Sequence, residues 1–124
     1  MLTYDDVVTE LKTIVKDFGP THKVTGCRYF DIVERENAPI FNPVCLVGQL
    51  FSRILPADDI KWIAINANAI RVGGTVIWPR IKPLFDISDV YCIWGLLTDI
   101  QQMQDCGVTW DGALRASLGD RASV

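Results

Sequence analysis

The apolar residues near the start of this chain recur at the spacing of an α-helix. They are Val7, Val8, Leu11, Ile14, Val15 and Phe18. Side chains at this spacing share one helix face, and that face must pack against another element. Thr3 and Asp6 have the spacing of a capping box, and Gly19-Pro20 is a typical helix stop. We therefore predict an amphipathic helix between Thr3 and Gly19 that covers part of a core.

The segment that follows has the pattern of a short β-hairpin. Residues 27–33 are rich in β-forming side chains, and residues 34–37 are a polar turn, Glu-Arg-Glu-Asn. Pro39 has no N–H to donate, so it restricts a returning strand to the edge of a sheet. We expect two short strands between residues 24 and 41.

Helical patterns return after the hairpin. Asn42 is a good N-cap, and Pro43 suits the first position of a helix, where no N–H is needed. We therefore predict a second helix that begins there and is ended by Pro56. A third helix is expected from residue 58 or 59 until Gly73-Gly74 breaks it. Its inward-facing residues would be Ile60, Ile63, Ala67 and Ile70.

Residues 75–85 match no regular pattern. They hold two prolines, Pro79 and Pro83, among apolar residues that include Trp78. Because proline interrupts both helix and sheet interiors, we expect an extended, partly buried loop here, with at most a short strand.

The last third of the chain has a long helical pattern. Its expected core face consists of Val90, Ile93, Trp94, Leu97 and Ile100. We predict a helix from Ser88 (or Asp86) to about Cys106, a turn at Gly107, and a short helix that Thr109 caps. A frayed tail is expected from about residue 119. The elements together predict a mainly α (α+β) fold: a compact bundle of about five helices with a small β-hairpin after the first helix, in one domain over residues 1–124.

The composition is apolar for so small a chain. Hydrophobic residues make up 49% of the 124 residues and charged residues 22%, and the mean hydropathy is +0.20. No segment reaches the roughly 18 apolar residues of a membrane span, and Asp5-Asp6 place acid where a secretory signal needs base. We expect a cytoplasmic location without membrane contact. The apolar excess predicts either a very complete core or a surface that a partner covers.

The charge balance argues against a general nucleic-acid binder. Net charge is −3, the isoelectric point is about 5.0, and no cluster of Lys and Arg is present. The turn at Gly107 leaves one alternative open, a DNA-binding regulator with a C-terminal helix-turn-helix. Its recognition helix would offer only Arg115 and Arg121 as cations, and Gly112 would weaken it. Ordinary helix packing is the preferred interpretation, and nucleic acid is an unlikely partner.

The four cysteines predict neither a metal site nor a cofactor. They stand at positions 27, 45, 92 and 106 without a C-x-x-C pair, and His22 is the only histidine. We expect reduced thiols, as in most cytoplasmic proteins. Cys45 would lie in the first turn of its predicted helix, where the helix dipole lowers a thiol's pKa, and His22 could activate it. A cysteine-dependent enzyme is therefore a remote alternative, and we predict no catalytic residues.

Aromatic residues predict a protein-binding surface. Four tryptophans occur in the chain, and Trp and Tyr are common anchors of interfaces. Trp94 lies within the core face of the long helix, whereas Trp78 stands beside a proline in the predicted loop. We predict contacts at Trp78 and on the outer side of the long helix near Tyr91, Ile100 and Met103. A closed homodimer is the commonest assembly for such a surface.

Three segments resemble a family of small proteins of unknown function. They are residues 27–30 (Cys-Arg-Tyr-Phe), residues 43–48 (Pro-Val-Cys-Leu-Val-Gly) and residues 101–114, which contain Gln104-Asp105-x-Gly107-x-Thr109-Trp110. Members of this family are encoded by actinobacteriophages and related actinobacterial genomes. The resemblance implies a bacteriophage protein that acts in the cytoplasm of its bacterial host, and it transfers no site residues. We predict a protein that works by binding a host protein or by self-association.

Overall fold

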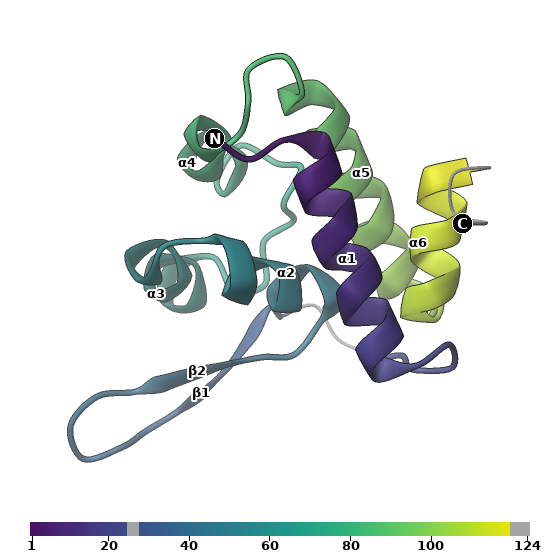
Figure 1. Ribbon diagram of the computed structural model, residues 1–124. Helices are drawn as coiled ribbons and strands as arrows, with labels where there is room; N and C mark the ends of the chain where they lie inside the picture. The colour runs from purple at the N-terminus through teal and green to yellow at the C-terminus, as the bar shows by residue number, and fades with distance from the viewer. Residues whose placement is uncertain (25–27, 120–124) are drawn as a thin grey trace.

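The structure is a computed structural model that describes residues 1–24 and 28–119, and it is mainly helical (Figure 1). In chain order its elements are α1 (Tyr4–Phe18), β1 (Phe30–Val33), β2 (Ile40–Pro43), α2 (Leu46–Ile54), α3 (Ala57–Asn66), α4 (Trp78–Ile81), the 3-10 helix η1 (Lys82–Leu84), α5 (Val90–Asp105) and α6 (Trp110–Leu118). This confirms the predicted fold class, a helical bundle with a small hairpin after the first helix. Each helix described is too short or too polar to cross a membrane.

The first helix forms as predicted. The hydroxyl of Thr3 accepts a hydrogen bond from the N–H of Asp6, and the carboxylate of Asp6 accepts one from the N–H of Thr3. This capping box also lowers the pKa of the Asp6 carboxyl. Gly19 ends the helix with φ +92°, a conformation that side chains with a Cβ rarely adopt. The apolar face of α1 packs against α2, α5 and α6.

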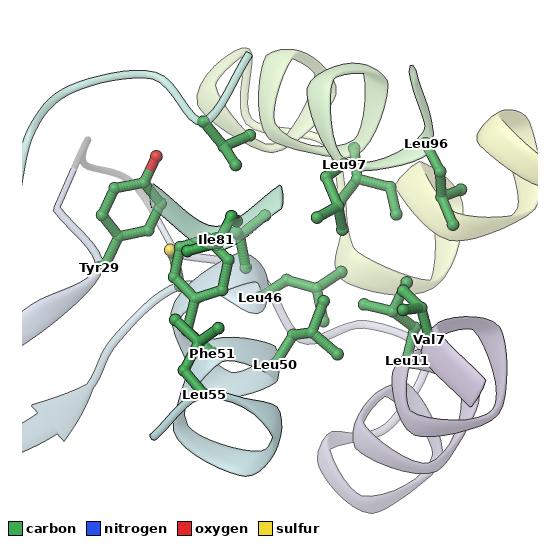
Figure 2. Packing of buried hydrophobic residues seen from close by; sticks show 14 of the residues in the cluster. Val7, Leu11, Tyr29, Leu46, Leu50, Phe51, Leu55, Ile81, Leu96 and Leu97 are labelled. Atoms are coloured by element: carbon green, nitrogen blue, oxygen red, sulfur yellow. The ribbon is translucent and has the colours of Figure 1, made fainter. Parts of the chain in front are cut away.

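The core lies where α1, α2 and α5 meet. Figure 2 shows Leu11, Leu50 and Leu97 pointing into the same space from the three helices, and all three are fully buried. The buried apolar side chains form one connected cluster, which also includes Trp110 of α6. Burying a side chain of this size contributes about 1.5–3 kcal/mol, so this cluster is the main source of stability.

The hairpin is antiparallel and extends away from the helices (Figure 1). Its register pairs Phe30 with Pro43 and Val33 with Ile40. Phe30 is buried at the base of the hairpin, whereas Ile40 is 44% exposed near its far end. The strands therefore meet the core only where they adjoin α2 and α3.

The predicted start of the second helix is wrong. Asn42 and Pro43 continue β2, and α2 begins three residues later with Cys45 as its N-cap. The hairpin supplies the reason, because the N–H of Val44 donates to the carbonyl of Tyr29 at 2.8 Å. Pairing with β1 extends the chain through Pro43, which stands at the end of a strand where its missing N–H costs little.

Residues 75–85 are not the extended loop that their prolines predict. They contain α4 and η1, and Pro79 and Pro83 are each the second residue of a helix. The N–H groups of a first helical turn have no partner within the helix, so proline is tolerated there.

Helices α3 and α5 are shorter than predicted. Helix α3 ends at Asn66 rather than at Gly73, and Ile70 is 37% exposed instead of facing inward. Helix α5 begins at Val90, because Asp86 and Ser88 form a turn in which the Asp86 carboxylate accepts from the Ser88 N–H. The predicted frayed tail lies outside the described residues, apart from Gly119, which ends α6. Cys27 lies outside them as well.

Candidate protein-interaction surface

Two of the four predicted contact residues lie together. Trp78 of α4 and Tyr91 of α5 line one surface cavity of about 250 Å³, together with Lys82 and Trp94. We call these four residues the aromatic groove. Tyr91 is 82% exposed and Trp94 38% exposed, so the two rings present a large apolar area to solvent.

A rigid base holds Trp78 in the groove. Its ring stacks on the buried ring of Phe85 with a centroid distance of 5.7 Å and an angle of 14°. The segment around Phe85 is tied to the start of the chain, because Leu2 donates to the carbonyl of Leu84 at 3.0 Å and accepts from the N–H of Asp86 at 2.7 Å. Trp78 therefore contributes to the groove with little side-chain freedom left to lose on binding.

Trp94 is not the core residue that its place in the helical stripe predicts. The buried face of α5 runs through Val90, Ile93 and Leu97, and Trp94 lies at its edge. Its indole N–H donates to the carbonyl of Gly73 at 3.2 Å. A polar tip that bonds a neighbouring loop leaves the face of the ring available for contact.

The other two predicted contacts do not line the groove. Ile100 is fully buried, so its assignment to the outer side of α5 is wrong, whereas its assignment to the core face is confirmed. Nine residues separate it from Tyr91, which is half a turn beyond two full turns and places the two on opposite faces. Met103 is half-buried near the end of α5.

The remote alternative of a reactive cysteine loses its main support. Cys45 is 2% exposed, and burial raises the pKa of its thiol to about 11, although the N–H of Gly48 donates to its sulfur at 3.2 Å. The predicted lowering of this pKa is wrong, because desolvation outweighs the helix N-terminus. The ring of His22 packs on Phe18 and Trp110 instead, at centroid distances of 4.8 and 4.4 Å.

Sequence reasoning missed two buried glutamines on α5. The Gln104 side-chain oxygen accepts from the N–H of Leu46 at 2.6 Å. That of Gln101 accepts from the N–H of Val72 at 2.7 Å, and its NH₂ group donates to the hydroxyl of Tyr29. A signal was present, because both glutamines follow Leu97 at four and seven residues and so continue its buried stripe.

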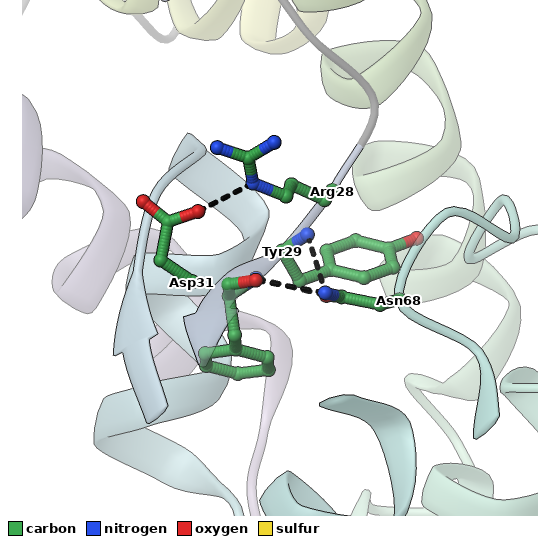
Figure 3. Close-up of polar contacts among 5 residues, drawn as sticks. Arg28, Tyr29, Asp31 and Asn68 are labelled. Atoms are coloured by element: carbon green, nitrogen blue, oxygen red, sulfur yellow. Dashed lines mark hydrogen bonds and ion pairs between the residues drawn. The ribbon is translucent and has the colours of Figure 1, made fainter. Parts of the chain in front are cut away.

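An asparagine fastens the hairpin to the helices. Figure 3 shows the Asn68 amide against the backbone of β1: its oxygen accepts from the N–H groups of Tyr29 and Phe30, and its NH₂ donates to the Phe30 carbonyl at 2.7 Å. On the outer side Arg28 and Asp31 form an ion pair (Figure 3). The amide thus satisfies backbone groups that a third strand would otherwise bond.

Burial raises the pKa of the Tyr29 hydroxyl, which donates to the Ile70 carbonyl.

The turn at Gly107 joins two packed helices. Gly107 has φ +87°, and the hydroxyl of Thr109 caps α6 by accepting from the N–H of Gly112 at 3.0 Å. Within the described part of α6 the only cation is Arg115, and it pairs with Asp111 at 2.9 Å. A recognition helix needs basic side chains for phosphates, and this surface offers one that is already ion-paired. Arg121 lies outside the described residues.

Cys92 and Cys106 are exposed, and over residues 1–24 and 28–119 no group of three His, Cys, Asp or Glu side chains is placed to hold a metal ion.

Comparison with protein-family models, with curated proteins and with solved structures finds no match to this chain.

Proposed function

We propose that this protein acts by binding another protein through the aromatic groove. The observation that carries the proposal is the gathering of Trp78, Tyr91 and Trp94 from two helices around one exposed cavity. Tryptophan and tyrosine supply large, rigid contact area and dominate the energetics of many interfaces. Three such rings around a single cavity suit the insertion of an apolar side chain from a partner.

The charge at the groove suggests the polar part of that partner. Lys82 lines the cavity, and it forms no ion pair with any residue that the structure describes. A carboxylate beside the inserted apolar side chain would pair with this ammonium group at the rim, where charge selects partners more than it adds affinity. The proposed ligand is therefore a protein segment in which an apolar residue adjoins an aspartate or glutamate.

The resemblance to actinobacteriophage proteins guides the choice of partner. It implies a chain that acts inside a bacterial host, and a host protein would then carry the recognised segment. We include this origin in the proposal, and we take an actinobacterial lysate as the source of candidate partners.

A capture experiment with matched baits tests the proposal. Lys82→Glu reverses the charge in the groove on an exposed side chain, and Ile65→Glu places a glutamate on α3, where Ile65 is 58% exposed. We expect a host protein that is captured by the wild type and by Ile65→Glu and is lost with Lys82→Glu. Equal capture by all three baits would contradict a role for the groove.

A peptide array then tests the chemistry of the ligand. Wild-type protein applied to overlapping peptides of the captured partner should bind those in which an apolar residue adjoins a carboxylate. Replacing that carboxylate by an amide should weaken binding to the wild type, because it removes the ion pair with Lys82. The same replacement should weaken binding to Lys82→Ala less, because that variant has no ion pair left to lose. Binding confined to basic peptides would overturn the assignment.

A further inference from the structure

Helices α1 and α6 border a cavity with a basic rim. This cavity of about 360 Å³ lies beside the second half of α1. Among the described residues it is lined by the cations Lys12, Lys16 and Arg115 and by one acid, Asp111. Its remaining lining is largely apolar and comprises Val15, Gly19, Pro20, Leu114 and Leu118. We call this region the basic end.

A second cavity borders the same two helices and is acidic. It measures about 540 Å³ and lies between the start of α1, α5 and Ser117 near the end of α6. Asp5, Asp89 and Asp99 line it, and the described residues of its lining include neither Lys nor Arg. The C-terminal end of α6 adds the partial negative charge of its carbonyl groups. We call this region the acidic end.

Several charges of the two ends form no ion pair with any residue that the structure describes. Of the five ion pairs of the described residues, one joins Arg115 to Asp111 within the basic end, and two join Arg53 to Glu10 and Asp17 beside α1. Lys12 and Lys16 form none of these pairs and stand four residues apart on one helix face, where like charges repel.

The two ends lie at a separation that one interface can span. Asp5 and Lys12 are seven residues apart on α1, which is two turns and about 10 Å along the helix axis. They therefore share one face of α1, with the acid near its start and the base near its end. A surface with opposite charges at its two ends is complementary to itself after a half-turn rotation. Twofold dimers require this property, because each contact between one residue of the first copy and another residue of the second occurs again with the two copies exchanged.

We infer that a second copy of this chain docks on the α1–α6 side, with the basic end of each protomer on the acidic end of the other. Lys12 and Lys16 of one protomer then face Asp5 and Asp99 of its partner, and the arrangement occurs twice in the dimer. Leu114 and Leu118 lie beside the cations of the basic end, and both are buried. The acidic end shares Tyr91 with the aromatic groove, but the four charged residues of the proposed contact do not line the groove. Variants at these four residues therefore test the inference separately from the proposed function.

A charge-swap experiment tests the inference. The variant Asp5→Lys/Asp99→Lys makes both ends basic, and Lys12→Glu/Lys16→Glu makes both acidic. Sedimentation equilibrium should show a wild-type dimer, and each variant alone should dimerise at least roughly 100-fold more weakly because like charges then oppose each other. An equimolar mixture of the two variants should form a one-to-one heterodimer, since both contacts are again complementary.

The mixture separates an interface from a damaged fold. Loss of stability, for example from Asp5→Lys at the start of α1, weakens a variant but cannot create a heterodimer. Lys82→Glu should leave the wild-type dimer intact, which distinguishes this surface from the aromatic groove. A wild-type chain that stays monomeric up to about 100 µM, or variants that fail to associate with each other, would overturn the inference. Binding of phosphate to Lys12 and Lys16 without dimerisation would overturn it as well and identify an anion site.

Discussion

Two helical glycines stand in opposite surroundings. A Cβ at Gly48 of α2 would lie 2.3 Å from the carbonyl oxygen of Tyr29, which is backbone and has no room to move away. A Cβ at Gly95 in the middle of α5 would meet nothing within 4 Å. The first glycine permits the close approach of α2 to the start of the hairpin, whereas the second only weakens its helix.

We therefore expect opposite effects from the same substitution. Gly48→Ala should lower the free energy of unfolding by about 2 kcal/mol or more, because the added methyl forces α2 away from Tyr29. Gly95→Ala should raise it by about 0.5–1 kcal/mol, the usual difference between the two residues in a helix. Urea denaturation of both variants checks the pair, and a tolerated Gly48→Ala would contradict the close packing.

Helix α5 binds two distant segments through side-chain amides. Gln104 holds the first N–H of α2, and Gln101 holds Val72 and Tyr29. Neither contact involves the backbone of α5, so the helix stays regular while it fixes the position of its neighbours. These amides connect the second half of the chain to the base of the hairpin.

Removal of one amide should cost more than its size suggests. In Gln104→Ala the N–H of Leu46 remains buried without a partner, and we expect a loss of about 1–3 kcal/mol in the free energy of unfolding. Gln102→Ala on the exposed side of the same helix is the matched control, with an expected change within about 0.5 kcal/mol. Equal losses in thermal or urea unfolding would show that the amide bond is not the cause.

Local signals predicted the elements where they acted alone. The capping box at Thr3 and the stop at Gly19 depend on neighbours within a few residues, and both are confirmed. The helix start at Asn42 was wrong, because its signal competes with strand pairing to residues about a dozen positions earlier. Two of the four residues of the aromatic groove, Trp78 and Tyr91, were predicted as contact residues because aromatic rings commonly anchor interfaces. Lys82 and Trp94 depend on how α4 docks against α5, which spacing does not encode.

At the scale of the whole molecule, stability responds to alkaline pH. Burial raises the pKa of the Cys45 thiol from 9.0 to about 11 and also raises that of the Tyr29 hydroxyl. The folded chain therefore holds these protons at pH values where the unfolded chain releases them. Since release stabilises the unfolded state, the free energy of unfolding decreases once the pH exceeds the ordinary pKa of the thiol.

We expect the midpoint of urea unfolding to fall as the pH rises from 9.0 to about 11. Cys45→Ser should show a shallower decline, because its hydroxyl does not titrate in this range and still accepts from the Gly48 N–H as an N-cap. Cys92→Ser, at an exposed position, is the control and should decline like the wild type. Identical profiles for all three proteins would contradict the burial of a protonated thiol.

Residues 2–4 are hydrogen-bonded to residues 84–89, which are synthesised much later. Leu2 bonds to Leu84 and Asp86, and the N–H of Tyr4 donates to the Asp89 carboxylate at 2.8 Å. During synthesis, α1 therefore emerges long before the residues that bond to Leu2 and Tyr4. Until α5 has been synthesised, part of the apolar face of α1 has no packing partner. Exposed apolar surface of this kind is what chaperones bind. The native surroundings of α1 are therefore complete only after α5 and α6 have been synthesised.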